Sequence, residues 1–213
     1  MKMGNKANSI ALALGAGLAF SFLPSAGLPM MDATQSVAEA ATVKAWDFSK
    51  DIGGWAYCGA YSYSGQASAA YDAAFGGSMK VMVDFSGDKD QSWSEVKLSD
   101  TSVTNAAPIK VGKGATALTY DMYYDPAQVK GDAQLKTKVY AQSVKGEEVI
   151  NQNVDDIGLA TAKSVPGSTM KKVHVKVYFD DPVEQDISHI ELSVVSYLTA
   201  YKGAIYINNI ELK

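Results

Sequence analysis

Trp93 lies in a short segment whose residue types are suited to holding a sugar ring. Residues 91–98 have the sequence Gln-Ser-Trp-Ser-Glu-Val-Lys-Leu, and strand alternation would put Trp93, Glu95 and Lys97 on one face, opposite the apolar residues. A tryptophan that shares its face with two charged residues is not expected in a core. It would offer a flat apolar surface beside hydrogen-bonding groups, which is the combination a sugar requires. The alternative is a tryptophan at a strand end that a loop half covers.

Further polar side chains share this outward orientation on other predicted strands. Within residues 116–123 and 135–142 the apolar positions alternate with polar ones. The polar residues singled out on these outward faces are Asp121, Tyr123, Lys138 and Gln142. Each can donate or accept a hydrogen bond to a hydroxyl group, so we expect them to join Glu95 and Lys97 in a binding site.

The elements that would position these residues are almost all strands. Alternation with a period of two recurs in residues 79–85, 116–123, 135–141, 173–179, 190–194 and 205–212. Clusters of glycine, proline, serine and aspartate separate these runs, as is typical of turns. Apart from a possible helical turn near residues 156–162, no helical periodicity is present. The pattern predicts an all-β protein with an antiparallel β-sandwich.

The first forty residues have the pattern of a secretory signal peptide. Lys2 and Lys6 precede a 14-residue run of apolar and small residues, residues 10–23. Small residues at positions 38 and 40 suit signal peptidase, so we expect cleavage after Ala40. The run is too short to span a membrane, which needs about 20 apolar residues. The sequence therefore predicts a protein without a membrane span, secreted or held at the cell surface.

Residues 41–213 have the size of a single domain. The charged residues of the chain limit the kinds of ligand that this domain is expected to bind. The net charge of the full chain is −4, and all nineteen basic residues are lysines. Nucleic-acid binding is not expected, and the absence of arginine favours a neutral ligand over a phosphate or a uronate. The one cysteine, Cys58, cannot form an internal disulfide, and we expect it to be a small buried residue. His174 and His189 have no companions at zinc-ligand spacing.

Five short motifs occur in an order that resembles a known family. They are Trp46-Asp-Phe48, Gly53-Gly-Trp55, Gly77-Ser-Met-Lys-Val81, the Trp93 segment, and Ala204-Ile-Tyr-Ile-Asn-Asn-Ile-Glu-Leu212. The chain resembles the carbohydrate-binding modules of bacterial β-mannanases, especially family 27, with families 11, 23 and 35 as looser relatives. The resemblance implies a jelly-roll, galactose-binding-like sandwich. It also implies a non-catalytic role, in which a concave face binds a β-1,4-linked mannan or glucomannan.

The resemblance also assigns residues to the binding of sugar. Exposed tryptophans serve as stacking platforms in the family, and Trp55 and Trp93 correspond to two of them. A third platform would be expected in residues 143–153, which contain no aromatic residue. Tyr123, Tyr140 or Tyr197 could take its place. Because of this departure, a neighbouring specificity such as β-glucan stays open.

A structural calcium ion is a further implication of the resemblance. In the family it lies between the first and last strands, bound by a carboxylate near the opening Asp-Phe pair and by backbone carbonyls. Asp47 corresponds to that carboxylate, and Asn209 belongs to the closing motif. Relatives usually have Asp-Asn there, whereas this chain has Asn208-Asn209. Calcium accepts amide oxygens but prefers carboxylates.

Two other functions are compatible with the sequence. A small glycoside hydrolase would need two facing carboxylates, and Glu95 and Glu191 could supply them. An adhesin or assembly protein could use the exposed aromatic residues against a protein partner. The preferred interpretation is a monomeric, non-enzymatic module that acts with separate glycoside hydrolases. With two platforms we expect weak binding, with a Kd on the order of 1 to 100 μM.

Overall fold

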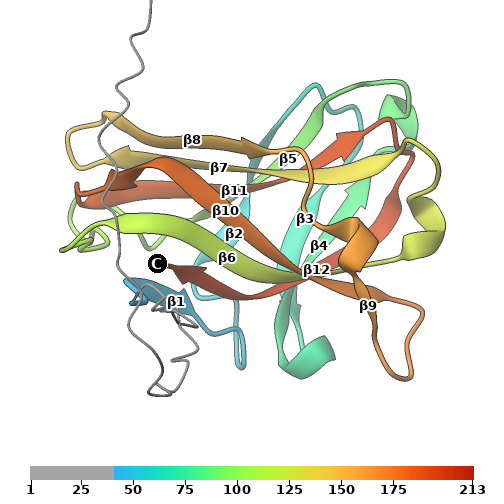
Figure 1. The fold of residues 1–213 in the computed structure, drawn as a ribbon, viewed down its shortest axis with the longest axis horizontal. Helices are drawn as coiled ribbons and strands as arrows, with labels where there is room; N and C mark the ends of the chain where they lie inside the picture. Colours follow the sequence, from blue (N-terminus) through green and yellow to red (C-terminus); the bar gives the residue numbers. More distant parts are fainter. Residues whose placement is uncertain (1–40) are drawn as a thin grey trace, which may run out of the picture. The chain divides into compact units, whose positions relative to one another are not determined.

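Two antiparallel β-sheets pack face to face in residues 41–213, which are the residues that the computed structural model describes (Figure 1). These residues belong to one compact unit. The all-β antiparallel sandwich predicted from the alternation is thereby confirmed. The predicted signal peptide, residues 1–40, lies outside the described residues.

The smaller sheet has five strands. Their spatial order is β2 (Trp55–Tyr61), β5 (Ser94–Asp100), β11 (Ile187–Tyr197), β7 (Gln134–Ser143) and β8 (Glu148–Val154). In Figure 1, β8, β7 and β11 run along the top of the view, above β6 and β12 of the other sheet.

The larger sheet has seven strands. Their spatial order is β3 (Ser68–Asp72), β4 (Ser78–Asp84), β12 (Lys202–Leu212), β6 (Ala115–Tyr124), β10 (Lys171–Val183) and β9 (Lys163–Ser164), while β1 (Lys44–Trp46) pairs with β12. Four short 3-10 helices lie in the connections of the described part: η1 (Ala74–Gly76), η2 (Ser86–Asp88), η3 (Pro126–Gln128) and η4 (Leu159–Thr161). No helix among residues 41–213 is long and apolar enough to cross a bilayer.

The core lies between the sheets because one side of each central strand is apolar. In β7, for example, Leu135, Thr137, Val139 and Ala141 are fully buried, and the alternate residues Lys136, Lys138 and Tyr140 are only partly buried. The largest fully buried side chains are Trp55, Tyr120, Tyr201, Phe48, Phe85 and Met79. Strands with a period of two thus turn their polar residues to the two outer faces.

Candidate functional site

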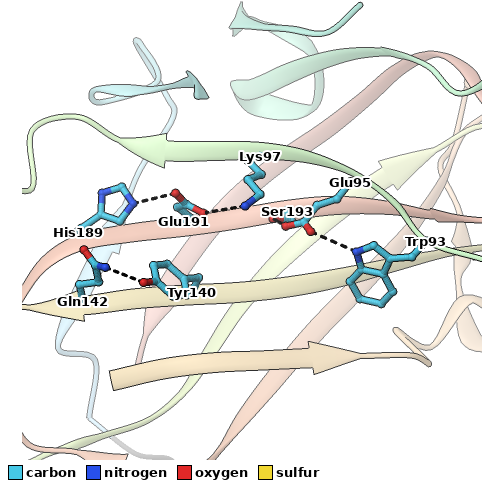
Figure 2. Close-up of polar contacts among 8 residues, drawn as sticks. All are labelled: Trp93, Glu95, Lys97, Tyr140, Gln142, His189, Glu191 and Ser193. Carbon is cyan, nitrogen blue, oxygen red and sulfur yellow. Dashed lines mark hydrogen bonds and ion pairs between the residues drawn. The ribbon is translucent and has the colours of Figure 1, made fainter. Parts of the chain in front are cut away.

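The three central strands of the five-stranded sheet bring most of the predicted binding residues onto one surface. Ser193 of β11 lies opposite Lys97 of β5 and Lys138 of β7. Directly opposed residues of antiparallel strands project from the same face. We call this surface the β5–β11–β7 face and define it by Trp93, Glu95, Lys97, Lys138, Tyr140, Gln142, His189, Glu191 and Ser193. Figure 2 shows all of these side chains except Lys138.

Trp93 is held at one end of this face by a buried carboxylate. It immediately precedes β5 and is partly exposed. Its indole Nε1 donates to Glu95 Oε2 at 3.2 Å, while the Ser193 hydroxyl donates to Glu95 Oε1 at 2.6 Å (Figure 2). Only 3% of Glu95 is exposed. Since a buried carboxylate must be hydrogen-bonded, Glu95 and Trp93 restrain each other, and the indole ring is fixed beside the sheet.

A second chain of contacts crosses the middle and the far end of the face. His189 Nε2 lies 2.9 Å from Glu191 Oε1, and Lys97 Nζ lies 4.0 Å from Glu191 Oε2. An ionised carboxylate only accepts hydrogen bonds, so His189 carries a hydrogen on Nε2. On β7, Gln142 Nε2 donates to the Tyr140 hydroxyl at 2.7 Å. The face therefore displays neutral and charged polar groups in separate groups of two or three residues rather than in one closed cluster.

Lys138 differs from its neighbours on the face. Its ammonium has no hydrogen bond or ion pair with another residue of the described part, and the side chain is partly exposed. It lies opposite Ser193 on one side and Asn153 on the other. An ammonium group carries three donors, so Lys138 is free to donate to a ligand near the centre of the face.

Tyr61 on the edge strand β2 adds an aromatic ring that the sequence did not predict. It lies opposite Glu95, and 61% of it is exposed. A register shift between Tyr57 and Gly59 adds Cys58 as an extra residue, so simple alternation assigns the wrong side of β2 beyond this point. Cys58 itself is exposed, which corrects its expected burial: it lies in the irregular part of an edge strand, where no second strand covers it.

Tyr197 also lies on this side of the sheet, next to the position of Trp93. Counting in steps of two along β11 places it with Glu191 and Ser193, and it is opposite Gln134. The ammonium group of Lys136 lies 4.2 Å from the centre of its ring. Of the three tyrosines considered as substitutes for the missing platform, Tyr140 and Tyr197 share a side with Trp93.

Trp55 is not a platform, which corrects the expectation drawn from the family. Only 1% of it is exposed, and its ring packs edge-on against Trp46 at a centroid distance of 5.5 Å. Trp46 Nε1 donates to the Asp100 carboxylate at 2.6 Å. Gly53 and Gly54 both have positive φ, which a glycine adopts at no steric cost. This turn starts β2 with the indole of Trp55 directed into the core.

Asp121 and Tyr123 face away from the core, as predicted, but on the other sheet. Both belong to β6 of the seven-stranded sheet, so they cannot join Trp93. The ring of Tyr123 stacks on Phe75 with centroids 4.1 Å apart. Alternation along a strand indicates which side a residue takes, but not which sheet the strand enters.

The surroundings of Asp121 form a closed polar cluster. Its carboxylate accepts from His174 Nδ1 at 3.0 Å and from Lys172 Nζ and Asn209 Nδ2, each at 2.8 Å. Burial would raise the pKa of Asp121, but the hydrogen bonds from Lys172, Asn209 and His174 outweigh it and hold the pKa below its ordinary value. We call Asp121, Lys172, His174 and Asn209 the Asp121 cluster.

The residues predicted to bind calcium do not converge on one point. Asp47 is exposed, and its carboxylate accepts from the backbone amide and the hydroxyl of Ser49 within its own turn. Asn209 points to Asp121 instead. Among residues 41–213 no group of three or more His, Cys, Asp or Glu side chains is arranged to hold a metal ion. The donor set at Asp47 and Asn209 therefore does not fit a calcium ion, which usually has six to eight oxygen ligands.

Glu95 and Glu191 are far apart for a pair of glycosidase carboxylates. Glu95 lies opposite Val195, four residues along β11 from Glu191. At the rise of a β-strand, this separates their backbones by roughly 13 Å along the strand direction. The carboxyl groups of glycosidases lie about 5 to 9.5 Å apart. Each carboxylate is also engaged by its own neighbours, Glu95 by Trp93 and Ser193 and Glu191 by His189 and Lys97.

Comparison with solved structures identifies similar sandwiches. A family 27 carbohydrate-binding module of Caldicellulosiruptor saccharolyticus, solved with mannohexaose, is 13% identical, with a TM-score of 0.60 over 80% of this chain and 96% of that chain. A module named TmCBM27, described for specific mannan recognition, is 17% identical, with a TM-score of 0.54 over 81% of this chain and 96% of that chain. A family 28 module specific for non-crystalline cellulose is 15% identical, with a TM-score of 0.55 over 75% of this chain and 87% of that chain. At such identities the similarity establishes the fold alone.

The sequence comparisons establish the family. No curated protein matches this chain. The family model described as carbohydrate binding module 27 matches residues 34–213, which include the whole sandwich. The order of motifs, the two-sheet fold and this match agree, and the chain belongs to the family of carbohydrate binding module 27.

Proposed function

We propose that the β5–β11–β7 face binds a neutral β-1,4-linked polysaccharide, with mannan or glucomannan as the preferred ligand. The observation that carries the proposal is the partly exposed Trp93 ring, fixed by Glu95 at the end of a surface of hydrogen-bonding side chains. The two family 27 structures, one solved with mannohexaose and one described for mannan recognition, support this choice of ligand. We further propose that the protein is secreted, monomeric and non-catalytic.

The chemistry of the face matches a sugar chain without charged groups. The Trp93 ring offers an aromatic surface to the C–H groups of one pyranose. Beyond it, Lys138, Gln142 and the pair formed by His189 and Glu191 supply donors and acceptors to hydroxyl groups. These groups follow the strands, so successive sugar residues of one extended chain can reach successive positions. No arginine is present to clamp a carboxylate or a phosphate.

Weak binding follows from the small number of aromatic platforms. Trp55 is buried, so Trp93 is the only tryptophan on this face, and Tyr61, Tyr140 and Tyr197 are the other rings on the same side of the sheet. A stacking contact contributes about 1 kcal/mol beyond its buried area, and much of the gain from several hydrogen bonds is offset by the loss of freedom on binding. We retain a Kd on the order of 1 to 100 μM.

The lack of catalysis is supported by the separation of Glu95 and Glu191. It is also supported by the family, whose model describes a binding module. A binding module without a catalytic site would act by holding substrate near separate glycoside hydrolases. The measurement that would contradict this part is release of reducing sugar from mannan by the purified domain, abolished by the Glu95→Gln substitution.

Titration of tryptophan fluorescence with three hexasaccharides tests the proposal directly. Mannohexaose, cellohexaose and xylohexaose share the β-1,4 linkage and differ in the orientation or presence of substituents. We expect a saturable change with mannohexaose that is lost in Trp93→Ala, a variant whose circular dichroism stays that of the wild type. If the folded protein responds to none of the three, the β-1,4-glycan proposal is wrong, and a protein-binding role for the exposed rings becomes the better explanation.

A further inference from the structure

Asn208 occupies the region where the family resemblance implies a metal ion. It lies in β12, and 5% of it is exposed. Its side-chain Nδ2 donates to the carbonyl oxygens of Phe75 and Gly77 at 3.2 and 3.3 Å. Two backbone carbonyls of the segment around η1 are thus turned toward one amide nitrogen.

Unusual backbone conformations in this segment turn the carbonyl groups of Phe75 and Gly77 toward Asn208. Phe75, Gly76 and Gly77 have φ of 58°, 86° and 102° in succession, and for Phe75 this left-handed conformation is unfavourable. Gly77 is pressed against the Phe48 carbonyl oxygen, so that a Cβ at position 77 would overlap it. The segment is held over the outer face of the seven-stranded sheet by the stack of Phe75 on Tyr123 and by Asn208.

The orientation of the Asn208 amide follows from its neighbours. With Nδ2 toward the carbonyls, both of its hydrogens are used, while Oδ1 is buried without a hydrogen-bond partner. An unsatisfied buried acceptor costs about 1 to 3 kcal/mol. The reverse orientation would place three oxygen atoms against one another and would require a cation between them. Without a cation, the orientation with Nδ2 toward the carbonyls is the more favourable of the two, because the amide hydrogens carry the partial positive charge that the carbonyls need.

We infer that the Asn208 amide takes the place of a bound cation, and that this domain holds the η1 segment to β12 without calcium. An aspartate at position 208 would present only oxygens to the Phe75 and Gly77 carbonyls, and would require a cation between them. Asparagine supplies two N–H donors instead. Asp47 and Asn209, the other residues suggested for a metal, are engaged in separate contacts. This inference does not depend on the sugar-binding proposal.

Thermal unfolding of the mature wild-type domain in calcium and in chelator tests the inference, together with the metal content of the purified protein. We expect the same Tm in both solutions and far less than one calcium per chain. A wild-type Tm that rises with calcium, or stoichiometric calcium in the purified domain, would overturn it. These two measurements need no variant, so they remain decisive if a substitution prevents folding.

The Asn208→Asp substitution tests whether the side-chain amide of Asn208 takes the place of a bound cation. In chelator we expect a lower Tm than that of the wild type, because a buried carboxylate would face two carbonyls. Calcium should restore most of this loss. Asn105→Asp adds the same charge in an exposed loop and should show neither effect. A folded Asn208→Asp variant whose Tm is insensitive to calcium would show that position 208 does not act in place of a cation.

Discussion

On the β5–β11–β7 face, Glu95 and Glu191 contact different neighbours at separate places along the strands, whereas on the seven-stranded sheet Lys172, His174 and Asn209 all converge on Asp121. Both outer faces contain a histidine, lysines, a carboxylate and an aromatic ring. In the Asp121 cluster these groups satisfy one another, and Tyr123 is covered by Phe75. A ligand there would first have to break existing contacts.

The β5–β11–β7 face, in contrast, has polar and aromatic groups that a ligand could contact. The ammonium group of Lys138 has no hydrogen bond or ion pair with the described residues, the Trp93 ring is partly exposed, and the neighbouring Tyr61 ring is largely exposed. Residue types alone therefore do not mark a binding face. What distinguishes it is the combination of an exposed ring, a carboxylate that fixes the ring, and donors that the fold leaves free.

Loss of Trp55 should change stability more than any other substitution considered, because Trp55 lies in the core and Trp93 on the β5–β11–β7 face. Trp55→Ala should lower the free energy of unfolding by about 3 to 5 kcal/mol, because it removes a fully buried indole that packs on Trp46. Chemical denaturation measures this loss. Trp93→Ala should change stability far less. If Trp55→Ala left stability intact and reduced sugar affinity, Trp55 would be a platform after all.

The affinity for sugar should distinguish the β5–β11–β7 face from the outer face of the seven-stranded sheet. Trp93→Ala should weaken mannohexaose binding at least about tenfold, which corresponds to about 1.4 kcal/mol, because the main stacking surface is lost. Tyr123→Ala, the matched change on the seven-stranded sheet, should leave affinity unchanged. Isothermal titration calorimetry of both variants gives the comparison. Equal losses of affinity in the two would show that the sugar does not bind where we propose.

Glu95 should act through the orientation of Trp93. Glu95→Ala removes the acceptor for the indole N–H and should weaken binding about two- to tenfold, the range expected for one hydrogen bond. Glu95→Gln keeps an oxygen acceptor of the same length and should retain most of the affinity. The near-ultraviolet circular dichroism of the tryptophans should change in Glu95→Ala and not in Glu95→Gln. An affinity loss in the glutamine variant as large as in the alanine variant would mean that the charge, rather than the orientation of the ring, is needed.

Acid should weaken the Asp121 cluster. The folded-state pKa of Asp121 is lowered, so its stabilising contribution is present above the unfolded pKa of about 3.9 and is lost as the pH falls through the folded value. Asp84, whose pKa is lowered to about 2 by hydrogen bonds from Lys202 and Ser86, should act in the same direction. The Tm of the wild type should therefore fall steeply below about pH 4. Asp121→Asn should be less stable at neutral pH and show a flatter decline; parallel profiles would exclude Asp121 as a cause.

The smallest loss of affinity is expected for Tyr61, on the edge strand β2 beside the β5–β11–β7 face. Tyr61→Ala should reduce affinity about two- to fivefold, less than about 1 kcal/mol, as is usual for a contact at the rim of an interface. Tyr178→Ala, which removes another exposed tyrosine from β10, is the control and should have no effect. Both are measured by the same calorimetric titration, and an unchanged affinity in Tyr61→Ala would show that the bound sugar does not extend from the β5–β11–β7 face onto β2.

The fold class and the orientation of most predicted site residues follow from the sequence alone. Trp93, Glu95, Lys97, Lys138, Tyr140 and Gln142 face away from the core as alternation requires, since successive side chains of a strand point to opposite sides. The separation of apolar from polar positions is a local property of each strand. It can therefore be derived without knowing where the strand lies.

Which strands become neighbours, in contrast, depends on how the whole chain folds. β6 enters the seven-stranded sheet, so Asp121 and Tyr123 leave the predicted site. The bulge at Cys58 brings Tyr61 into it, and the turn at Gly53 and Gly54 buries Trp55. Strand pairing joins residues far apart in the chain, and a one-residue shift in register reverses the side on which every following residue lies. Neither property can be read from the period of a single strand.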